Sequence, residues 1–147
     1  MKRRVAYWAL LISWMVFIFV MSQMAGEESS EQSRFVVWLF GALGLDLDGW
    51  FGEMTMWVVR KAAHTFEYFM LFILAHNVVH IYLKSWWRLA ISLGVVFLYA
   101  CTDEWHQTFV DGRAGCWEDV LIDTNGGIIG MVFLLAWYWV KKRIWVR

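Results

Sequence analysis

The sequence predicts an all-α membrane protein: a bundle of four transmembrane helices, with a short interfacial or re-entrant helix in the first outer loop. Three observations favour this fold class. The 147 residues are 61% hydrophobic and include 12 Trp and 11 Phe, more than the core of a soluble domain of this length needs. Thirteen basic residues balance 13 acidic ones, which excludes the charge excess typical of disordered or nucleic-acid-binding chains. No segment alternates apolar and polar residues at a period of two, so a β-barrel is not expected.

Four apolar segments are long enough to cross a bilayer, which takes about 20 helical residues. They are residues 5–21, 57–83, 88–103 and 119–140. The first is uncharged and is not followed by a small-residue A-x-A site, so we expect a retained span and not a cleaved signal peptide. In the fourth, Gly126 and Gly130 form a GxxxG pair, which predicts close packing against a neighbouring span of the same chain. Together the spans are expected to form one domain, residues 1–147.

The connection between the first two spans, residues 22–56, is long for a simple loop. Residues 22–33 are polar, and we expect them to be irregular. Residues 35–45 are apolar but too short to span, so we interpret them as the interfacial or re-entrant helix.

Basic residues predict the direction of the spans. They cluster before the first span, between the second and third, and after the fourth: Lys2, Arg3, Arg4, Lys84, Arg88, Lys141, Lys142, Arg143 and Arg147. The other segments hold all 13 acidic residues. The positive-inside rule therefore places both termini in the cytoplasm, and residues 22–56 and 103–118 on the outer face.

Ionisable and polar residues gather at the outer ends of the last three spans. They are Arg60, Lys61, His64, Glu67 and Tyr68 on the second span, Asp103, Glu104 and Gln107 on the third, Asp119 and Asp123 on the fourth, and Arg113 in the loop between. Spacings of three or four residues place many of them on shared helical faces. One charge at the bilayer centre costs about 2.5–3.5 kcal/mol, so this concentration exceeds what helix packing needs. The sequence predicts an outer-leaflet pocket; a polar knot that locks the helices together is the alternative.

Three motifs resemble those of the VanZ-like family. The stretch RKAAHTFEY, residues 60–68, resembles its R-K-x-x-H-x-x-E-Y element. The stretch DEWHQ, residues 103–107, resembles its D-E-x-H-Q element, and Gly112-Arg113 resembles the G-R that follows. The stretch DVLIDTNG, residues 119–126, resembles its D-V-x-x-[ND]-x-x-G element.

The resemblance covers nearly the whole chain in order. It departs at Met24 and Asp111, where proline is common, and at Thr102, where serine is common, but no charged motif residue is missing. It implies a multi-pass protein of the bacterial plasma membrane, in a cell-envelope family associated with resistance to the glycopeptide antibiotic teicoplanin. It does not specify a reaction.

One hypothesis is an enzyme that acts on a phosphate-containing, lipid-linked or glycolipid substrate. Arg60, Lys61 and Arg113 would hold its anionic head group. His64 would be the general base or acid, oriented by Glu67. The predicted catalytic residues are His64, Glu67, Asp103, Glu104, Gln107 and Asp119. The predicted substrate-binding residues are Arg60, Lys61, Tyr68, Arg113 and Asp123.

The sequence does not identify a cofactor, although carboxylates in this number could hold a divalent cation that polarises a phosphoryl oxygen. The candidate ligands are Asp103, Glu104, His106 and Asp119. The expected partners are the lipid bilayer and an amphiphilic or lipid-linked ligand, and not nucleic acid.

The second hypothesis is a non-catalytic protein that binds or modulates lipophilic envelope ligands or lipoglycopeptides. In that case the carboxylates only position Arg113, and His64 need not titrate. The sequence does not choose between the two hypotheses.

Overall fold

The computed structural model describes residues 1–24 and 26–145, and this part of the chain is helical and contains no strand. Its elements are α1 (Lys2–Ser22), α2 (Gly26–Ala42), α3 (Leu47–Phe51), the 3-10 helix η1 (Gly52–Met54), α4 (Thr55–Tyr82), α5 (Trp87–Gln107) and α6 (Trp117–Trp145). The predicted all-α class is confirmed. Arg147, one of the basic residues used to predict the orientation, lies outside the described residues.

Two helices, α1 and α6, are long and apolar enough to cross a membrane on their own. A third candidate span consists of α2 followed by the stretch Leu47–Tyr82, with a bend of 112° between the two parts. Helix α4 has 28 residues and α5 has 21, so at about 1.5 Å per residue both have the length of a span. Helix α4 also carries ionisable residues in its N-terminal half, and α5 carries them near its C-terminal end. Length and composition therefore support two or three spans, and the predicted four-span bundle is not confirmed.

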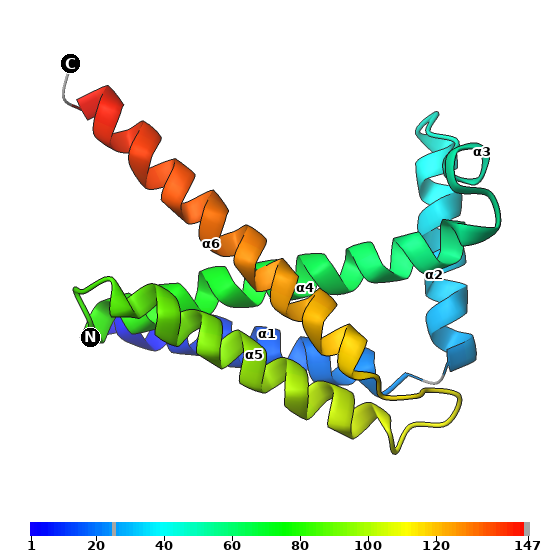
Figure 1. Ribbon diagram of the computed structural model, residues 1–147, viewed down its shortest axis with the longest axis horizontal. Coiled ribbons are helices and arrows are strands. Elements are labelled where there is room, and N and C mark those ends of the chain that lie inside the picture. The colour runs from blue at the N-terminus through cyan, green and yellow to red at the C-terminus, as the bar shows by residue number, and fades with distance from the viewer. Residues whose placement is uncertain (25, 146–147) are drawn as a thin grey trace.

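The long helices form a bundle with α4 and α5 as its central pair (Figure 1). Helix α1 packs on one side of this pair, and α6 crosses it on the other. The buried core is small and centres on α4 and α5, around Tyr68, Leu71, Phe72, Val96 and Ala100, and it includes Leu11 and Ile18 of α1.

The exterior of the bundle is apolar. Neighbouring residues on α6 such as Ile129, Val132 and Phe133 each expose about half of their surface. A small core inside an apolar exterior is what a helix bundle surrounded by lipid requires, because lipid and not water covers the outward side chains.

Glycines bring α6 against α4. A Cβ atom at Gly126 would lie 2.3 Å from the backbone oxygen of Thr65, and one at Gly130 would lie 3.0 Å from that of Phe69. The expectation that the GxxxG pair packs within the chain is confirmed. This close approach brings the start of α6 beside the residues of α4 that the sequence motif singled out.

The prediction that residues 22–33 are irregular is wrong, because most of them belong to α2. The Ser33 hydroxyl donates to the backbone oxygen of Ser29 at 3.0 Å, one turn earlier, so it is satisfied within the helix. Glu27 and Glu28 lie in the first turn, where the helix dipole favours acidic side chains. The apolar residues from Phe35 onward continue the same helix, which stands across one end of the bundle and contacts α4 (Figure 1).

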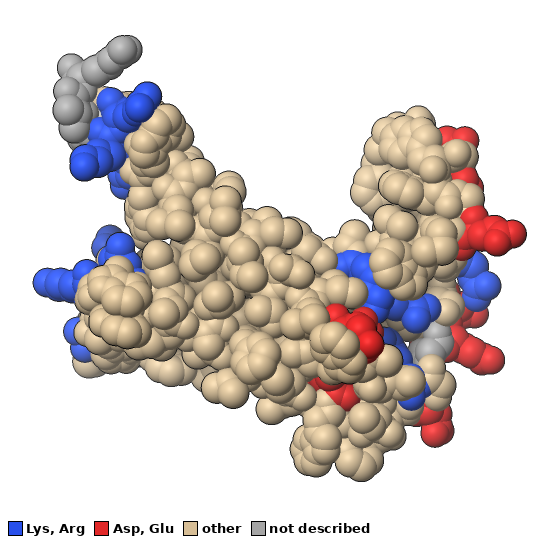
Figure 2. Space-filling view, in the orientation of Figure 1, with Lys and Arg blue, Asp and Glu red and all other residues tan. Residues whose placement is uncertain are grey.

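Charge is segregated along the molecule (Figure 2). Basic side chains gather at the end that carries the N-terminus, the α4–α5 turn and the C-terminal part of α6. Acidic side chains gather at the opposite end, around α2, α3 and the α5–α6 loop, together with a second group of basic side chains.

Candidate functional site

A cavity of about 150 Å³ lies where α1, α2 and α4 meet the end of α5. Its polar wall is formed by Arg60, His64, Glu67, Asp103 and Arg113. Its other walls combine the apolar side chains Ile18, Met21, Val36, Val59 and Ala63 with Ser22, Ser29, Gln32 and Ser33. The volume is below the roughly 300–1,000 Å³ of pockets that enclose a drug-sized ligand. The cavity therefore suits a head group and not a whole amphiphile.

The two arginines of the cavity bond to neutral groups. Arg60 Nη2 donates to Ser30 Oγ at 3.1 Å, and Arg113 Nε donates to the backbone oxygen of Met24 at 3.2 Å. The salt bridges found among the described residues involve neither guanidinium. Burial, followed by the charge of Arg60, lowers the pKa of Arg113. Two cations without an ion-pair partner are an arrangement that an anion would stabilise.

His64 pairs with Asp123. Its Nδ1 atom lies 3.5 Å from Asp123 Oδ1, whereas no hydrogen bond or ion pair among the described residues joins it to Glu67, the partner expected from the sequence. Glu67 lines the cavity, and its backbone oxygen accepts the Trp14 indole N–H at 2.9 Å. Sequence spacing within α4 could not reveal the Asp123 contact, because it depends on how closely α6 approaches. The sequence feature that could have indicated this contact is Gly126, three residues after Asp123, because a glycine there allows α6 to approach α4 closely.

Tyr68 and Gln107 both donate hydrogen bonds to the carboxylate of Asp103. The Tyr68 hydroxyl donates to Asp103 Oδ2 at 3.2 Å, and Gln107 Nε2 donates to the same oxygen at 3.4 Å. Tyr68 is fully buried in the core and does not line the cavity. The structure thus gives Tyr68 and Gln107 positioning contacts to Asp103, where the sequence suggested substrate binding and catalysis.

Lys61 and Asp119 form an ion pair with each other. Both side chains are partly exposed, and neither lines the cavity. The sequence assigned Lys61 to substrate binding and Asp119 to catalysis or metal binding. In the structure the two neutralise one another on the flank of the site.

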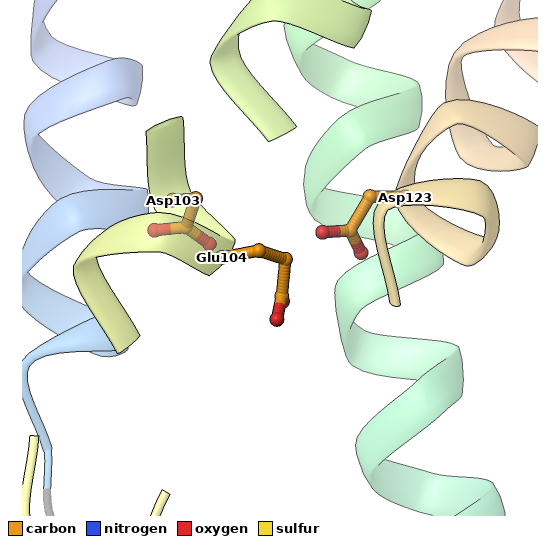
Figure 3. Close-up of side chains that lie close together, drawn as sticks. All are labelled: Asp103, Glu104 and Asp123. Atoms are coloured by element: carbon orange, nitrogen blue, oxygen red, sulfur yellow. The ribbon is translucent and has the colours of Figure 1, made fainter. Parts of the chain in front are cut away.

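Three carboxylates converge where α5 meets α6: Asp103, Glu104 and Asp123 (Figure 3). One oxygen from each lies within 4.8 Å of the others, and the residues are 4%, 5% and 1% exposed, respectively. We call these three residues the carboxylate cluster. Of the four metal-ligand candidates from the sequence, only Asp103 and Glu104 belong to it. Asp119 pairs with Lys61, and the His106 ring packs on Phe19 with centroids 4.7 Å apart.

The α5–α6 loop holds Glu104 in place. The backbone N–H of Cys116 donates to Glu104 Oε2 at 3.0 Å. A Cβ atom at Gly115 would lie 2.2 Å from the backbone oxygen of Glu104, so a glycine is needed for the loop to come this close. The contact between Glu104 and the loop was not predicted from the sequence.

Comparison with known proteins identifies the family of the chain. The model of the family described as VanZ/LLP1 matches residues 7–139, a range that contains the cavity polar wall and the carboxylate cluster. No curated protein and no solved structure matches the chain.

Proposed function

The chain belongs to the VanZ/LLP1 family, and we propose that it is a bacterial cell-envelope membrane protein whose polar cavity binds the phosphate-containing head group of a lipid-linked or glycolipid substrate. The family resemblance also motivates a link to glycopeptide resistance, such as resistance to teicoplanin. The residue roles below are part of this proposal.

The proposed topology has four spans, α1, α4, α5 and α6, with both termini in the cytoplasm. The lengths of α4 and α5 and their central place in the bundle support it. The gathering of basic side chains at one end supports the orientation, by the positive-inside rule (Figure 2). In this orientation the cavity opens in the outer leaflet, and α2 lies at or re-enters the outer interface.

The observation that carries the proposal is that Arg60 and Arg113, neither in an ion pair, face a cavity with an apolar wall. A guanidinium binds phosphate through paired hydrogen bonds, which no other side chain reproduces. Because the cavity holds about 150 Å³, the tail of an amphiphile would lie outside it, along the apolar residues of α1 and α2. These features together favour an anionic amphiphile over a soluble anion.

The proposed reaction is hydrolysis or transfer at the phosphate. His64 would accept the proton of the attacking water or hydroxyl group, because it lines the same cavity as the two arginines. Asp123 at 3.5 Å would hold the imidazole and stabilise its protonated form. Glu67, in the same wall, would lie close enough to protonate or orient the leaving group.

The alternative is a protein that binds a lipophilic envelope ligand or a lipoglycopeptide without turnover. One observation favours it: among the hydrogen bonds of the described residues, none joins His64 to a hydroxyl or thiol group that could serve as a nucleophile. In this case Arg60 and Arg113 would still bind the anionic group of the ligand, and the carboxylates would only position the two arginines.

The test measures binding of a polyprenyl phosphate to the protein in nanodiscs. Arg113→Lys keeps the charge but loses the paired hydrogen bonds, so we expect an affinity about tenfold lower, equivalent to about 1.4 kcal/mol. The matched control is Arg34→Lys, since Arg34 is an exposed arginine on α2 whose one ion pair, with Glu31, is also exposed. Equal affinities for the two variants would refute the proposed role of Arg113.

A further inference from the structure

We propose that Asp103, Glu104 and Asp123 bind a hard divalent cation such as Ca²⁺ or Mg²⁺. The proposal concerns cation binding alone and does not depend on which amphiphile enters the cavity. It replaces the ligand set expected from the sequence, since Asp123 takes the place of Asp119 and His106.

The first support is that the three carboxylates of the cluster lie close together. Two adjacent residues at the end of α5 and one on the second turn of α6 direct carboxylates towards a common space (Figure 3). One oxygen from each lies within 4.8 Å of the others. Three like charges this close and this buried repel one another strongly unless a cation or protons neutralise them.

The second, independent support is a set of buried carboxylate oxygens that accept no hydrogen bond within the described part of the chain. Asp103 Oδ1, Glu104 Oε1 and both Asp123 oxygens are shielded from water and, within the described part of the chain, receive no hydrogen bond. Leaving buried charged oxygens unpaired forfeits their hydration without replacement. Asp123 is the strongest case, because it is 1% exposed and, among the described residues, its one basic partner is His64, at 3.5 Å.

The third support is that the second carboxylate oxygens of Asp103 and Glu104 accept hydrogen bonds from neighbouring groups. Asp103 Oδ2 accepts from Tyr68 and Gln107, and Glu104 Oε2 accepts from the backbone of Cys116. In metal sites, outer hydrogen bonds of this kind fix a carboxylate while its second oxygen binds the ion. The division into one bonded and one free oxygen, repeated in two neighbouring residues, matches that pattern.

Nearby basic side chains do not fill the role of the cation. Lys61 pairs with Asp119, and the arginines bond to Ser30 and Met24. His64 can neutralise at most one of the three carboxylates, so the rest of the cluster's charge must be neutralised by protons or, as we propose, by a bound cation.

Ligand type and spacing identify the class of ion. Carboxylate oxygens without thiolate or thioether ligands suit Mg²⁺, Mn²⁺ and Ca²⁺. Two oxygens on one ion can be separated by at most twice the metal–oxygen distance, about 4.6–5.2 Å for Ca²⁺ and about 4.0–4.2 Å for Mg²⁺. Because the three oxygens lie within 4.8 Å of one another, modest side-chain movement brings them to the spacing of either ion, and the titration below decides between Ca²⁺ and Mg²⁺.

The experiment uses the full chain in detergent, stripped with a chelator and titrated with Ca²⁺ or Mg²⁺ without any lipid substrate. Calorimetry measures stoichiometry and affinity, and thermal unfolding measures the midpoint with and without the ion. For the unmodified chain we expect saturable binding of one divalent cation per molecule, Ca²⁺ or Mg²⁺, and a midpoint that rises with ion concentration.

Asp123→Asn is expected to lower Ca²⁺ affinity by tenfold or more and to remove the rise in midpoint. In chelator the same variant should unfold at the same or a higher temperature than the unmodified chain, because a buried like charge is gone. The matched control is Glu118→Gln, which removes an exposed carboxylate at the start of α6 and should bind Ca²⁺ normally.

Two results would overturn the inference: no saturable binding of either ion by the unmodified chain, or equal loss of affinity in Asp123→Asn and Glu118→Gln. The measurement on the unmodified chain is decisive even if Asp123→Asn does not fold. Because no amphiphile is present, failure here leaves the head-group proposal standing, and failure of head-group binding leaves this one standing.

Discussion

At the scale of single residues, the contact between His64 and Asp123 separates the two candidate functions. If His64 transfers a proton, His64→Gln keeps a hydrogen-bonding side chain but cannot titrate. We expect turnover of a lipid-linked phosphate to fall by about 100-fold or more, while affinity for it stays within a few fold. Phosphate release and head-group binding in nanodiscs measure the two quantities.

His80→Gln is the matched control, since this histidine bonds to Arg88 near the other end of α4. It should change neither quantity. A protein that only binds its ligand would tolerate His64→Gln as well as His80→Gln, and full turnover by His64→Gln would exclude the proposed proton transfer.

Spacing along the sequence predicted which residues share a helix face, but not which residues meet across helices. Arg60, His64 and Glu67 were expected on one face, and all three line the cavity. Asp119 was expected beside them, yet it pairs with Lys61 on the flank. Two acids four residues apart on α6 lie on the same side of the helix, and only the rotation of α6 against α4 decides which one reaches His64.

At the scale of the elements, the close approach of α6 to α4 depends on Gly126. Gly126→Ala places a Cβ atom 2.3 Å from a backbone oxygen of α4, and backbone cannot yield as a flexible side chain can. We expect α6 to be pushed outward, at a cost of about 1–3 kcal/mol in the free energy of unfolding. Thermal unfolding in detergent measures the loss.

Gly94→Ala is the control for this prediction. Gly94 lies within α5, and a Cβ atom there would meet nothing within 4 Å. Because alanine favours a helix over glycine by up to about 1 kcal/mol, this variant should be neutral or stabilising. Equal stability of the two variants would mean that Gly126 does not set the distance between the helices.

Apolar runs in the sequence predicted the positions of the long helices α4 and α6 well, but the secondary structure of residues 22–33 was predicted wrongly. The segments at 57–83 and 119–140 lie largely within α4 and α6, because lipid-facing helices need long apolar stretches. Residues 22–33 were expected to be irregular from their polarity alone. They are helical because serine, glutamate and glutamine can serve as helix residues when their polar groups are satisfied locally or exposed, which a polarity average does not register.

At the scale of the whole molecule, the proposed topology rests on the separation of basic and acidic ends (Figure 2). Alkaline phosphatase is active only outside the cytoplasm. Fusions after Glu28 or Gly112 are therefore expected to be active, and a fusion after Ser85, in the α4–α5 turn, is expected to be inactive. The reverse pattern would place the cavity in the inner leaflet.

The central claim is that Arg60 and Arg113 bind the phosphate of an amphiphile in the cavity. The most direct measurement is an experimental structure of the protein with a polyprenyl phosphate, determined in lipid. We predict phosphate density between the two guanidinium groups, with the tail leaving along the apolar wall formed by α1 and α2. Head-group density elsewhere on the protein, with both arginines still on Ser30 and Met24, would contradict the account.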